Sequence, residues 1–402
     1  MIHEIVIIGG GFGGVRVAKD LLKNGKDIHI TLIDKNKFHS FHPNFYEVAT
    51  AYLSERPSRA EINFHELAKT SSVSFEEIFW NDLNISIVED EVLSVDFKNK
   101  DINLKSVVKK SYDYLVLGVG SEINYFNIPL LKEKSMPLKN LRDALLIRNA
   151  IDELFAGSPK NKLLKIVIGG GGFTGCEFAA ELVGYLKTLS KIHGRPEHYV
   201  ECLVVDLSPV LLPSASPWVQ RVAKERLESL GVKVILNTSI EKITDFDILV
   251  WAGGVAANSF VKNLERVKLE KGCVAVDSYL RVMPYENVFG VGDVVYCINE
   301  RTGKSLPMTA SVAIKEAKCA AKNILKSIEK KKLIKYKPYF PGFVIPLGGK
   351  YALFERGGFH FSGILPWVVK YLISLNYWIS ILEFKKGFSI WKKGVKMFLK
   401  ND

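Results

Sequence analysis

Two apolar runs, each followed by a glycine-rich turn, dominate the pattern of hydrophobic and polar positions along the chain. The first run, Ile5–Ile8, continues into Gly9–Gly14, and the second, Ile166–Ile168, continues into Gly169–Gly175. An unbroken apolar run bounded by turn residues predicts a strand buried on both faces. Helical patterns follow both turns, so each segment predicts a strand, a glycine turn and a helix.

The glycine spacing of the first turn is typical of a dinucleotide-binding site. Gly9 allows a tight turn, Gly11 lets backbone amides approach a pyrophosphate, and Gly14 permits close packing of the helix. A second apolar run, Ile28–Ile33, ends at Asp34, which lies 20 residues after Gly14. An acid at this position is expected to accept hydrogen bonds from ribose hydroxyls.

The second turn repeats this arrangement with a longer connection. A β-run from Glu201 to Val205 ends at Asp206, 31 residues after Gly175. We interpret Leu186–His198 as an insertion that lengthens the helix and its exit loop. No arginine directly follows Asp206, which favours a ribose 2′-hydroxyl over a 2′-phosphate and therefore NADH over NADPH. Two such turns imply one bound redox cofactor and one exchangeable one.

Further apolar runs complete both predicted sheets. Tyr112–Ser121 predicts a buried strand that rejoins the first sheet, and Ile248–Gly254 predicts the equivalent strand of the second. The short alternating runs Ile85–Val88 and Val92–Val95 predict antiparallel strands. The glycine turn before Asp293 places an acid at a helix start, where it could accept from ribityl hydroxyls.

An aromatic-rich segment, Phe38–Glu47, is predicted to be a loop that turns at Pro43. It could pass beneath a flavin ring or simply form a packed aromatic loop. His39 and His42 are three residues apart in this segment, but no cluster of acids or cysteines lies near them in the sequence. We therefore expect no metal site.

Composition narrows the cellular setting. With 402 residues, 48% hydrophobic and 24% charged, the chain can form two or three globular domains. Its five cysteines include no Cys-x-x-Cys pair, and the N-terminus enters a strand without a signal-peptide pattern, which favours the cytoplasm. The net charge of +12 suits nucleic acid, anionic cofactors or an anionic membrane. The C-terminal sequence favours the membrane, and we expect no nucleic-acid partner.

Lysines gather on one side of a predicted C-terminal helix, and apolar residues gather on the other. The basic side comprises Lys385, Lys386, Lys392, Lys393, Lys396 and Lys400, and the apolar side Phe388, Trp391, Val395, Phe398 and Leu399. A basic amphipathic helix of this kind is expected to lie in the interface of an anionic membrane, with its rings at the acyl boundary.

The preceding run, Ile364–Leu382, has 19 residues with Lys370 as its only charge. That length is close to a membrane span, but Pro366 and several polar residues interrupt it. We therefore expect a helix that dips into the membrane or packs in a dimer. A C-terminal helical hairpin packed on its own protein remains the alternative.

These motifs together resemble the type II NADH:quinone oxidoreductases, the single-chain, non-proton-pumping NADH dehydrogenases. The resemblance rests on Gly9–Gly14 with Asp34, Pro43–Thr50, Tyr112–Ser121, Gly170–Leu182, Trp251–Val255, Gly290–Asp293 and the C-terminal segment. It implies an α/β fold with two Rossmann-like dinucleotide-binding domains and a C-terminal amphipathic helical segment that anchors the protein to the membrane. The implied enzyme transfers electrons from NADH through FAD to a quinone, and is a peripheral, monotopic homodimer on the cytoplasmic face of the cell membrane.

The resemblance also implies the domain limits and the binding residues. The FAD-binding domain would comprise 1–157 and 282–335, the NADH-binding domain 158–281, and the membrane-association domain 336–402. The implied FAD contacts are Gly9, Gly11, Phe12, Gly13, Gly14, Asp34, Lys35, Val92, Gly120, Asp293 and Ala310. The implied NADH contacts are Gly170, Gly172, Phe173, Gly175, Glu177, Asp206, Ala252 and Gly253, with Glu177 near the point where nicotinamide meets flavin. A helix N-terminal acid is an equally compatible role for Glu177.

The chain departs from the family pattern at the implied quinone site. The family usually has glutamines where this chain has Ser311 and Lys315, and a threonine where it has His42. Lys370 and Ile373 match a lysine and an isoleucine that border the family's quinone tunnel. The departures leave open an NADH reductase for a soluble acceptor.

Two other functions stay open at this point. A sulfide:quinone oxidoreductase requires a pair of redox cysteines beside the flavin, for which only Cys176 and Cys319 are candidates. A non-enzymatic flavin-bearing redox sensor or membrane-tethered interaction protein is the second.

Overall fold

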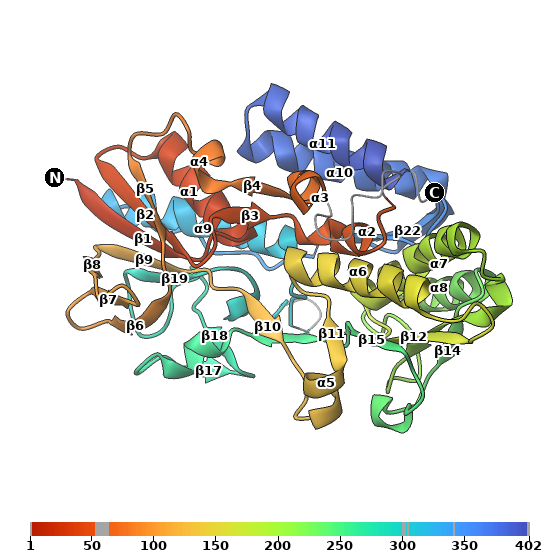
Figure 1. Ribbon diagram of the computed structural model, residues 1–402. Helices are drawn as coiled ribbons and strands as arrows, with labels where there is room; N and C mark the ends of the chain where they lie inside the picture. Colours follow the sequence, from red (N-terminus) through yellow and green to blue (C-terminus); the bar gives the residue numbers. More distant parts are fainter. Residues whose placement is uncertain (1, 53–63, 300–302, 304, 341, 400–402) are drawn as a thin grey trace. The chain divides into compact units, whose positions relative to one another are not determined.

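The computed structural model of the protein (Figure 1) describes residues 2–52, 64–299, 303, 305–340 and 342–399. The chain divides into two compact units, each assembled from three segments. The first unit contains Met1–His39, Val73–Glu122 and Val255–Pro341; the second contains Ser40–Ser72, Ile123–Gly254 and Gly342–Asp402.

The first unit is built on a parallel five-stranded sheet with the order β19-β9-β1-β2-β5. Its strands are β1 (His3–Ile8), β2 (Ile28–Asp34), β5 (Ile85–Glu89), β9 (Tyr114–Leu117) and β19 (Val288–Gly290). Helix α1 (Phe12–Asn24) connects β1 to β2 and packs against α9 (Ala310–Ile328). The apolar run at Ile5–Ile8 is buried because β1 is the central strand. The predicted return of the Tyr112–Ser121 run to this sheet is confirmed by β9.

The prediction of an antiparallel strand at Ile85–Val88 is wrong. As β5, this run pairs in parallel with β2, with Ile30 opposite Ile85. An edge strand is partly exposed, so its apolar and polar residues alternate like those of an antiparallel strand. The prediction for Val92–Val95 is confirmed, because β6 (Val92–Asp96) pairs antiparallel with β7 (Asp101–Leu104), which also pairs with β8 (Lys109–Ser111).

The rest of the first unit consists of short elements around this sheet. They are α4 (Phe75–Ile78), η4 (Ser259–Asn263), η5 (Gly292–Val294) and a three-stranded sheet of β17 (Leu269–Glu270), β18 (Cys273–Ala275) and β20 (Val295–Tyr296). Two short pairings occur where the chain passes from one unit to the other: β3 (Phe38–Ser40) with β4 (Ser72–Ser74), and β10 (Ser121–Ile123) with β16 (Val255–Ala257).

The second unit contains another parallel five-stranded sheet, with the order β11-β15-β12-β13-β14. Its strands are β11 (Ser135–Pro137), β12 (Leu164–Gly169), β13 (Val200–Val205), β14 (Lys233–Ile235) and β15 (Ile248–Trp251). The helices and turns beside them are α5 (Pro129–Lys134), α6 (Leu141–Gly157), α7 (Phe173–His193), α8 (Pro217–Ser229), η2 (Glu197–Tyr199) and η3 (Ile240–Lys242). The α/β class with two dinucleotide-binding folds is therefore confirmed.

The longer second connection has the predicted cause. Helix α7 has 21 residues and α1 has 13, and α7 ends at Gly194, which adopts a left-handed conformation (φ +62°). The additional turns of helix and the exit through η2 account for the distance between the glycine turn and Asp206.

The aromatic segment predicted to be a loop is mainly regular structure. β3 is followed by η1 (His42–Asn44) and α2 (Phe45–Ala49), and α3 (Phe64–Ser71) comes later in the same part of the chain. Pro43 lies in the first turn of η1, where its fixed φ and missing N–H are compatible with a helical start. The proline therefore begins a helical segment and does not mark a loop.

The C-terminal part of the second unit is an antiparallel sheet followed by two helices. The strands are β21 (Phe343–Pro346), β22 (Ala352–Arg356) and β23 (Phe359–Gly363), and the helices are α10 (Ile364–Ile381) and α11 (Phe384–Phe398). The two helices lie side by side (Figure 1). Lys400, part of the predicted lysine face, lies outside the described residues.

Candidate functional site

The two glycine turns have the same backbone geometry. Gly9 and Gly170 adopt φ values of +101° and +113°, which residues with a side chain rarely adopt. A Cβ atom at Gly9 would lie 2.3 Å from the carbonyl oxygen of Gly118, and one at Gly170 would lie 2.4 Å from the Cα atom of Gly253. In each unit the turn therefore requires glycine, because the chain that leaves β9 in the first unit and β15 in the second passes directly beside it.

Two later glycines of each turn have different roles: one allows the helix to pack close to the turn, and the other leaves open space beside the helix start. A Cβ atom at Gly14 or Gly175 would lie 1.9 Å from the carbonyl oxygen of the first glycine of its turn. At Gly11 and Gly172, a Cβ atom would meet nothing within 4 Å. No side chain of the described residues caps the first turn of α1 or α7. Open space beside uncapped helix N–H groups fits a pyrophosphate in both units.

The two acids at the strand ends are held alike. Asp34 accepts a hydrogen bond from the Gly10 amide (2.7 Å), and Asp206 accepts one from the Gly171 amide (2.5 Å). The other carboxylate oxygen of Asp206 accepts from the Ser208 amide at 2.7 Å. Carboxylate oxygens have further acceptor capacity, so both acids can still receive ribose hydroxyls.

All residues implied to contact FAD lie in the first unit. The glycines, Phe12 and Lys35 follow β1 and β2, Val92 begins β6, and Ala310 begins α9. Gly120 has a φ of +70° and open space where a Cβ atom would lie. Asp293 accepts a hydrogen bond from the Ser121 hydroxyl at 2.5 Å. The fold thus gathers these residues into one unit, and their contact with FAD remains a prediction.

All residues implied to contact NADH lie in the second unit. Phe173 begins α7 and its ring lies 5.0 Å from that of Phe343. The Ala252 amide donates to the Gly169 carbonyl (2.8 Å), which brings Ala252 and Gly253 beside the glycine turn. Glu177 lies one turn inside α7.

A buried ion pair in the second unit joins α2 to α10. The Lys370 ammonium lies 2.5 Å from the Glu47 carboxylate, and these side chains are 12% and 4% exposed. The Tyr371 hydroxyl donates to the same carboxylate oxygen at 3.1 Å. The ammonium also lies 5.2 Å and 4.5 Å from the ring centroids of Tyr46 and Tyr371. Nothing in the sequence pattern predicts this cluster, although Glu47 belongs to the family-like segment Pro43–Thr50.

Two more acids from α7 face this cluster. Burial raises the pKa of Glu177 to about 8, with a lowering effect of Lys370 and raising effects of Glu47 and Glu181. Burial also raises the pKa of the Tyr46 phenol, and Glu47 and Glu177 reinforce the shift. Glu177 is therefore largely protonated at neutral pH, and Lys370 balances the charge of Glu47.

His39 has a structural role in the first unit. It is fully buried, and its Nδ1 donates to the Gly10 carbonyl at 2.9 Å. Burial lowers the pKa of His39 to about 4, so the ring is neutral at physiological pH. In the second unit, the His42 ring packs against that of Phe45 (4.9 Å). Within the described parts of the chain, no three or more His, Cys, Asp or Glu side chains are grouped as a metal site.

The residues implied to border quinone belong to both units. In the first, the Ser311 hydroxyl lies 3.2 Å from that of Thr309, and the Lys315 ammonium lies 4.1 Å from the ring centroid of Tyr339. In the second, Lys370 pairs with Glu47, whereas the Ile373 side chain is 55% exposed. Lys370 and Ile373 are three residues apart in α10, so their side chains are neighbours on the helix surface, with Lys370 turned more toward the interior.

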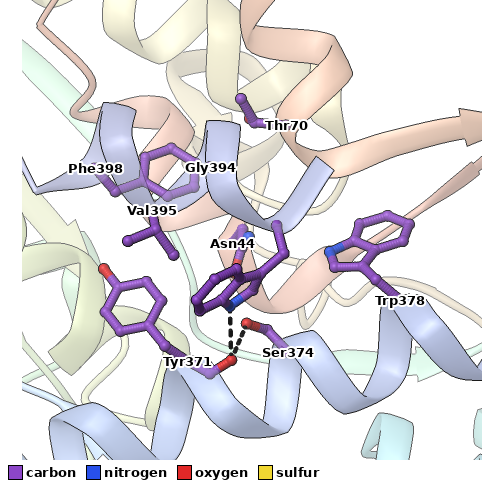
Figure 2. A pocket seen from close by; sticks show the side chains of 9 residues that line it. Asn44, Thr70, Tyr371, Ser374, Trp378, Gly394, Val395 and Phe398 are labelled. Atoms are coloured by element: carbon purple, nitrogen blue, oxygen red, sulfur yellow. Dashed lines mark hydrogen bonds between the residues drawn. The ribbon is translucent and has the colours of Figure 1, made fainter. Parts of the chain in front are cut away.

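A small cavity lies under the C-terminal helices (Figure 2). Its volume is about 10 Å³, and it lies between side chains of η1, α3, α10 and α11, among them Asn44, Tyr371 and Phe398. The Trp391 indole and the Ser374 hydroxyl both donate to the Tyr371 carbonyl at 2.8 Å and close one side. Ligand pockets are usually larger than this. We therefore treat the cavity as part of the packing between α10 and α11.

The apolar side of α11 faces outward only in part. Trp391, Val395 and Phe398 line the cavity against α10, and Phe398 is 2% exposed. The expectation of an outward-facing apolar side is thus wrong for Phe398, since a helix stripe that packs on a neighbouring helix has the same periodicity. Trp391 and Val395 are half-buried, and Phe388 and Leu399 are exposed. The five described lysines of the basic face are exposed.

The exposed apolar surface of this region lies instead on α10 and at the start of α11. It comprises Ile364, Leu365, Val368, Leu372, Ile373, Phe384 and Phe388. Among the described residues, α10 is the one helix whose length and mean hydropathy (1.3) would allow it to cross a membrane, and a third of it is buried.

The five cysteines are all unpaired. Cys176 is buried in the second unit, where its thiol donates to the Gly171 carbonyl at 3.4 Å, and burial raises its pKa. Cys319 belongs to the first unit, and burial raises its pKa to about 11. Raised thiol pKa values disfavour the thiolate that redox chemistry requires.

Two dinucleotide-binding folds of matching geometry define a nucleotide-dependent oxidoreductase. The chain belongs to the pyridine nucleotide-disulphide oxidoreductase family, which matches residues 3–317. The resemblance to type II NADH:quinone oxidoreductases is confirmed by the relatives. NdhA of Mycobacterium tuberculosis, which bears that name, is 28% identical over 412 aligned residues that cover 93% of this chain and 83% of NdhA.

Solved structures share the fold. NDH2 from Plasmodium falciparum, solved in complex with NADH, matches with a TM-score of 0.84 over 98% of both chains at 18% identity. The sulfide:quinone oxidoreductase of Aquifex aeolicus matches with a TM-score of 0.76, covering 98% of this chain and 92% of that enzyme at 20% identity.

Proposed function

We propose that the protein oxidises NADH and passes the electrons through FAD to a membrane quinone. The observation that carries the proposal is the repeated glycine turn, one in each unit, each with an acid at the end of the second strand. FAD would be bound by the first unit, which comprises 1–39, 73–122 and 255–341, and NADH by the second, within 123–254. The similarity to type II NADH:quinone oxidoreductases supports the choice of acceptor.

FAD, held by the glycine turn and Asp34 of the first unit, would supply the redox chemistry that connects NADH oxidation to quinone reduction. The residues of the chain position the nucleotides and hold protons. Glu177 stays uncharged at neutral pH because burial raises its pKa to about 8, so it can contact nicotinamide without placing a second negative charge beside Glu47. Glu177→Gln should retain FAD and alter NADH affinity or the NADH–flavin charge-transfer absorbance. Unchanged transient kinetics of flavin reduction by NADH would show that Glu177 does not contact the nicotinamide.

For the quinone we propose contacts from Ser311, Lys315, Lys370 and Ile373. Lys315 and Ser311 lie on the first turns of α9, the helix that begins at the proposed FAD contact Ala310. Ile373 belongs to the exposed apolar face of α10, which a lipid-soluble substrate can reach. Serine and lysine in place of glutamines favour, as a second candidate, a soluble electron acceptor.

The protein is proposed to associate peripherally with the cytoplasmic face of the cell membrane, as a homodimer. The exposed apolar residues of α10 would enter the lipid, and the exposed lysines of α11 would meet anionic headgroups. Because α11 itself packs on α10, this surface is presented by the helix pair and not by α11 alone.

The test compares two electron acceptors. The purified protein is expected to contain FAD and to oxidise NADH with menaquinone or ubiquinone analogues as well as with a soluble dye. Loss of residues 363–402 should lower the quinone activity more than the dye activity, since both glycine turns lie upstream. Quinone activity that survives the truncation as well as the dye activity would contradict the quinone assignment, whereas equal loss of both would show that these helices are needed for the fold of the second unit.

A further inference from the structure

A buried acid holds the backbone turn that presents Asp293. The turn follows β19, and its residue Gly292 has a φ of +80° and would bring a Cβ atom 3.4 Å from that of Ala313 in α9. The Gly292 amide donates to the Glu316 carboxyl group at 2.7 Å. The next residue, Asp293, accepts from the Ser121 hydroxyl at 2.5 Å. Glu316 thus links α9 directly to the turn from which the proposed FAD contact projects.

Glu316 is buried without a countercharge. Its side chain is 2% exposed, on the inner face of α9, and it forms no salt bridge with the described residues. The titratable groups around it are the carboxylate of Asp293, the thiols of Cys297 and Cys319, and the phenol of Tyr336. Burial raises the pKa of Cys319, Lys322 lowers it, and Glu316 raises it further. A carboxylate beside a second carboxylate and away from cations is costly to bury.

The chemistry of the surroundings favours an uncharged acid. Burial raises the pKa of Glu316 to about 8, and Asp293 adds to the shift, while hydrogen bonds from the Gly292 amide and the Cys297 thiol oppose it. A neutral carboxyl group still accepts from an amide through its carbonyl oxygen. A second fixed negative charge next to Asp293 would disfavour the addition of electrons to a cofactor bound there.

We propose that Glu316 is a positioning residue for the flavin: its buried carboxyl group accepts from the Gly292 amide and so fixes the turn from which Asp293 projects. This inference rests on the proposed function, which assigns FAD to the first unit. Glu316 does not touch the reacting atoms and acts through the Gly292 amide.

The experiment separates the shape of Glu316 from its charge. Glu316→Gln keeps an acceptor oxygen without the charge, and Glu316→Ala leaves the buried Gly292 amide unpaired. We expect Glu316→Gln to retain FAD like the natural protein. We expect Glu316→Ala to weaken FAD binding about 10- to 100-fold, because an unsatisfied buried amide costs about 1–3 kcal/mol. The readouts are FAD content after dialysis and visible circular dichroism of the bound flavin.

A matched control lies two turns further along α9. The Asn323 side chain is buried and joins α9 to the Tyr279 carbonyl (3.0 Å) and to the backbone of Ile334. Asn323→Ala should lower thermal stability but leave FAD affinity within about twofold, because it does not contact the Gly292 turn. Equal FAD loss in Asn323→Ala and Glu316→Ala would show a general effect of α9 and overturn the inference.

A pH titration tests the charge even if Glu316→Ala does not fold. In the natural protein, FAD affinity and the flavin reduction potential should both fall above about pH 8, as the carboxyl group ionises. In Glu316→Gln this additional fall should be absent. Identical pH profiles, or FAD loss in Glu316→Gln, would overturn the inference. Natural protein that contains no FAD would instead contradict the proposed function.

Discussion

Replacing Lys370 by methionine would remove the cation from the buried pair between α10 and α2. Methionine preserves most of the apolar stem, so the loss is mainly electrostatic. Breaking a buried ion pair typically costs about 3–5 kcal/mol, because one charge remains without a partner. The Tyr371 hydroxyl still donates to Glu47, which offsets part of the loss, but the contacts of the ammonium with the rings of Tyr46 and Tyr371 also disappear.

We therefore expect Lys370→Met to lower the stability of the second unit by about 3 kcal/mol. For a unit of this size the thermal midpoint should fall by about 6–12 °C. The assay is thermal unfolding of the FAD-loaded protein at one scan rate, followed by tryptophan fluorescence. Lys385→Met, on the exposed face of α11, is the matched control and should change stability by less than about 0.5 kcal/mol.

A double variant isolates the interaction between the two charges. Adding Glu47→Gln to Lys370→Met removes the orphaned carboxylate, so the double variant should be more stable than the sum of the single effects predicts. Additive effects, or a Lys370→Met protein within about 1 kcal/mol of the natural one, would refute this description of the cluster. The ratio of quinone to dye activity in the same variants tests whether Lys370 also borders the quinone.

Three further predictions concern nucleotide choice, pH and membrane binding. The kcat/KM for NADH should exceed that for NADPH at least about tenfold. Asp206→Ala should lower this ratio, because the acid that would repel a 2′-phosphate is removed. An unchanged ratio in Asp206→Ala would contradict the role of Asp206. Burial raises the pKa of Glu316 to about 8 from about 4.3 in an unfolded chain, so the folded state holds an extra proton between these values and stability falls as pH rises through them. The melting temperature of Glu316→Gln minus that of the natural protein should therefore be larger at pH 9 than at pH 6. Reversing the charge of Lys385, Lys386, Lys392 and Lys393 should abolish sedimentation with anionic vesicles at low salt, since each lysine contributes about 1 kcal/mol to the attraction to the membrane. Retained sedimentation would show that the lysine face of α11 is not the membrane-binding surface.

The two nucleotide-binding folds were predictable because their signals are local. Gly9 and Gly170 need a backbone conformation that few other residues adopt, and the acids at the strand ends follow at a spacing set by one helix and one strand. The additional length before Asp206 could also be assigned to α7, because the helical pattern continues without a break.

The buried clusters could not be predicted in this way. Glu47 and Lys370 are 323 positions apart in the sequence, and nothing in the pattern around either residue identifies its partner. Glu316 follows Lys315 directly, but only the packing of α9 on the Gly292 turn distinguishes a buried acid from an exposed one. The inward side of α11 was misassigned for a related reason: an apolar stripe can face lipid or a neighbouring helix with the same spacing.

The central claim is that electrons pass from NADH through bound FAD to a quinone in the membrane. The most direct measurement follows flavin absorbance anaerobically in full-length protein on vesicles that contain a long-chain quinone. NADH should bleach the flavin absorbance in the absence of quinone, and the absorbance should return when quinone-loaded vesicles are added. If NADH bleaches the flavin and a soluble dye restores the absorbance but the quinone vesicles do not, the acceptor assignment is wrong.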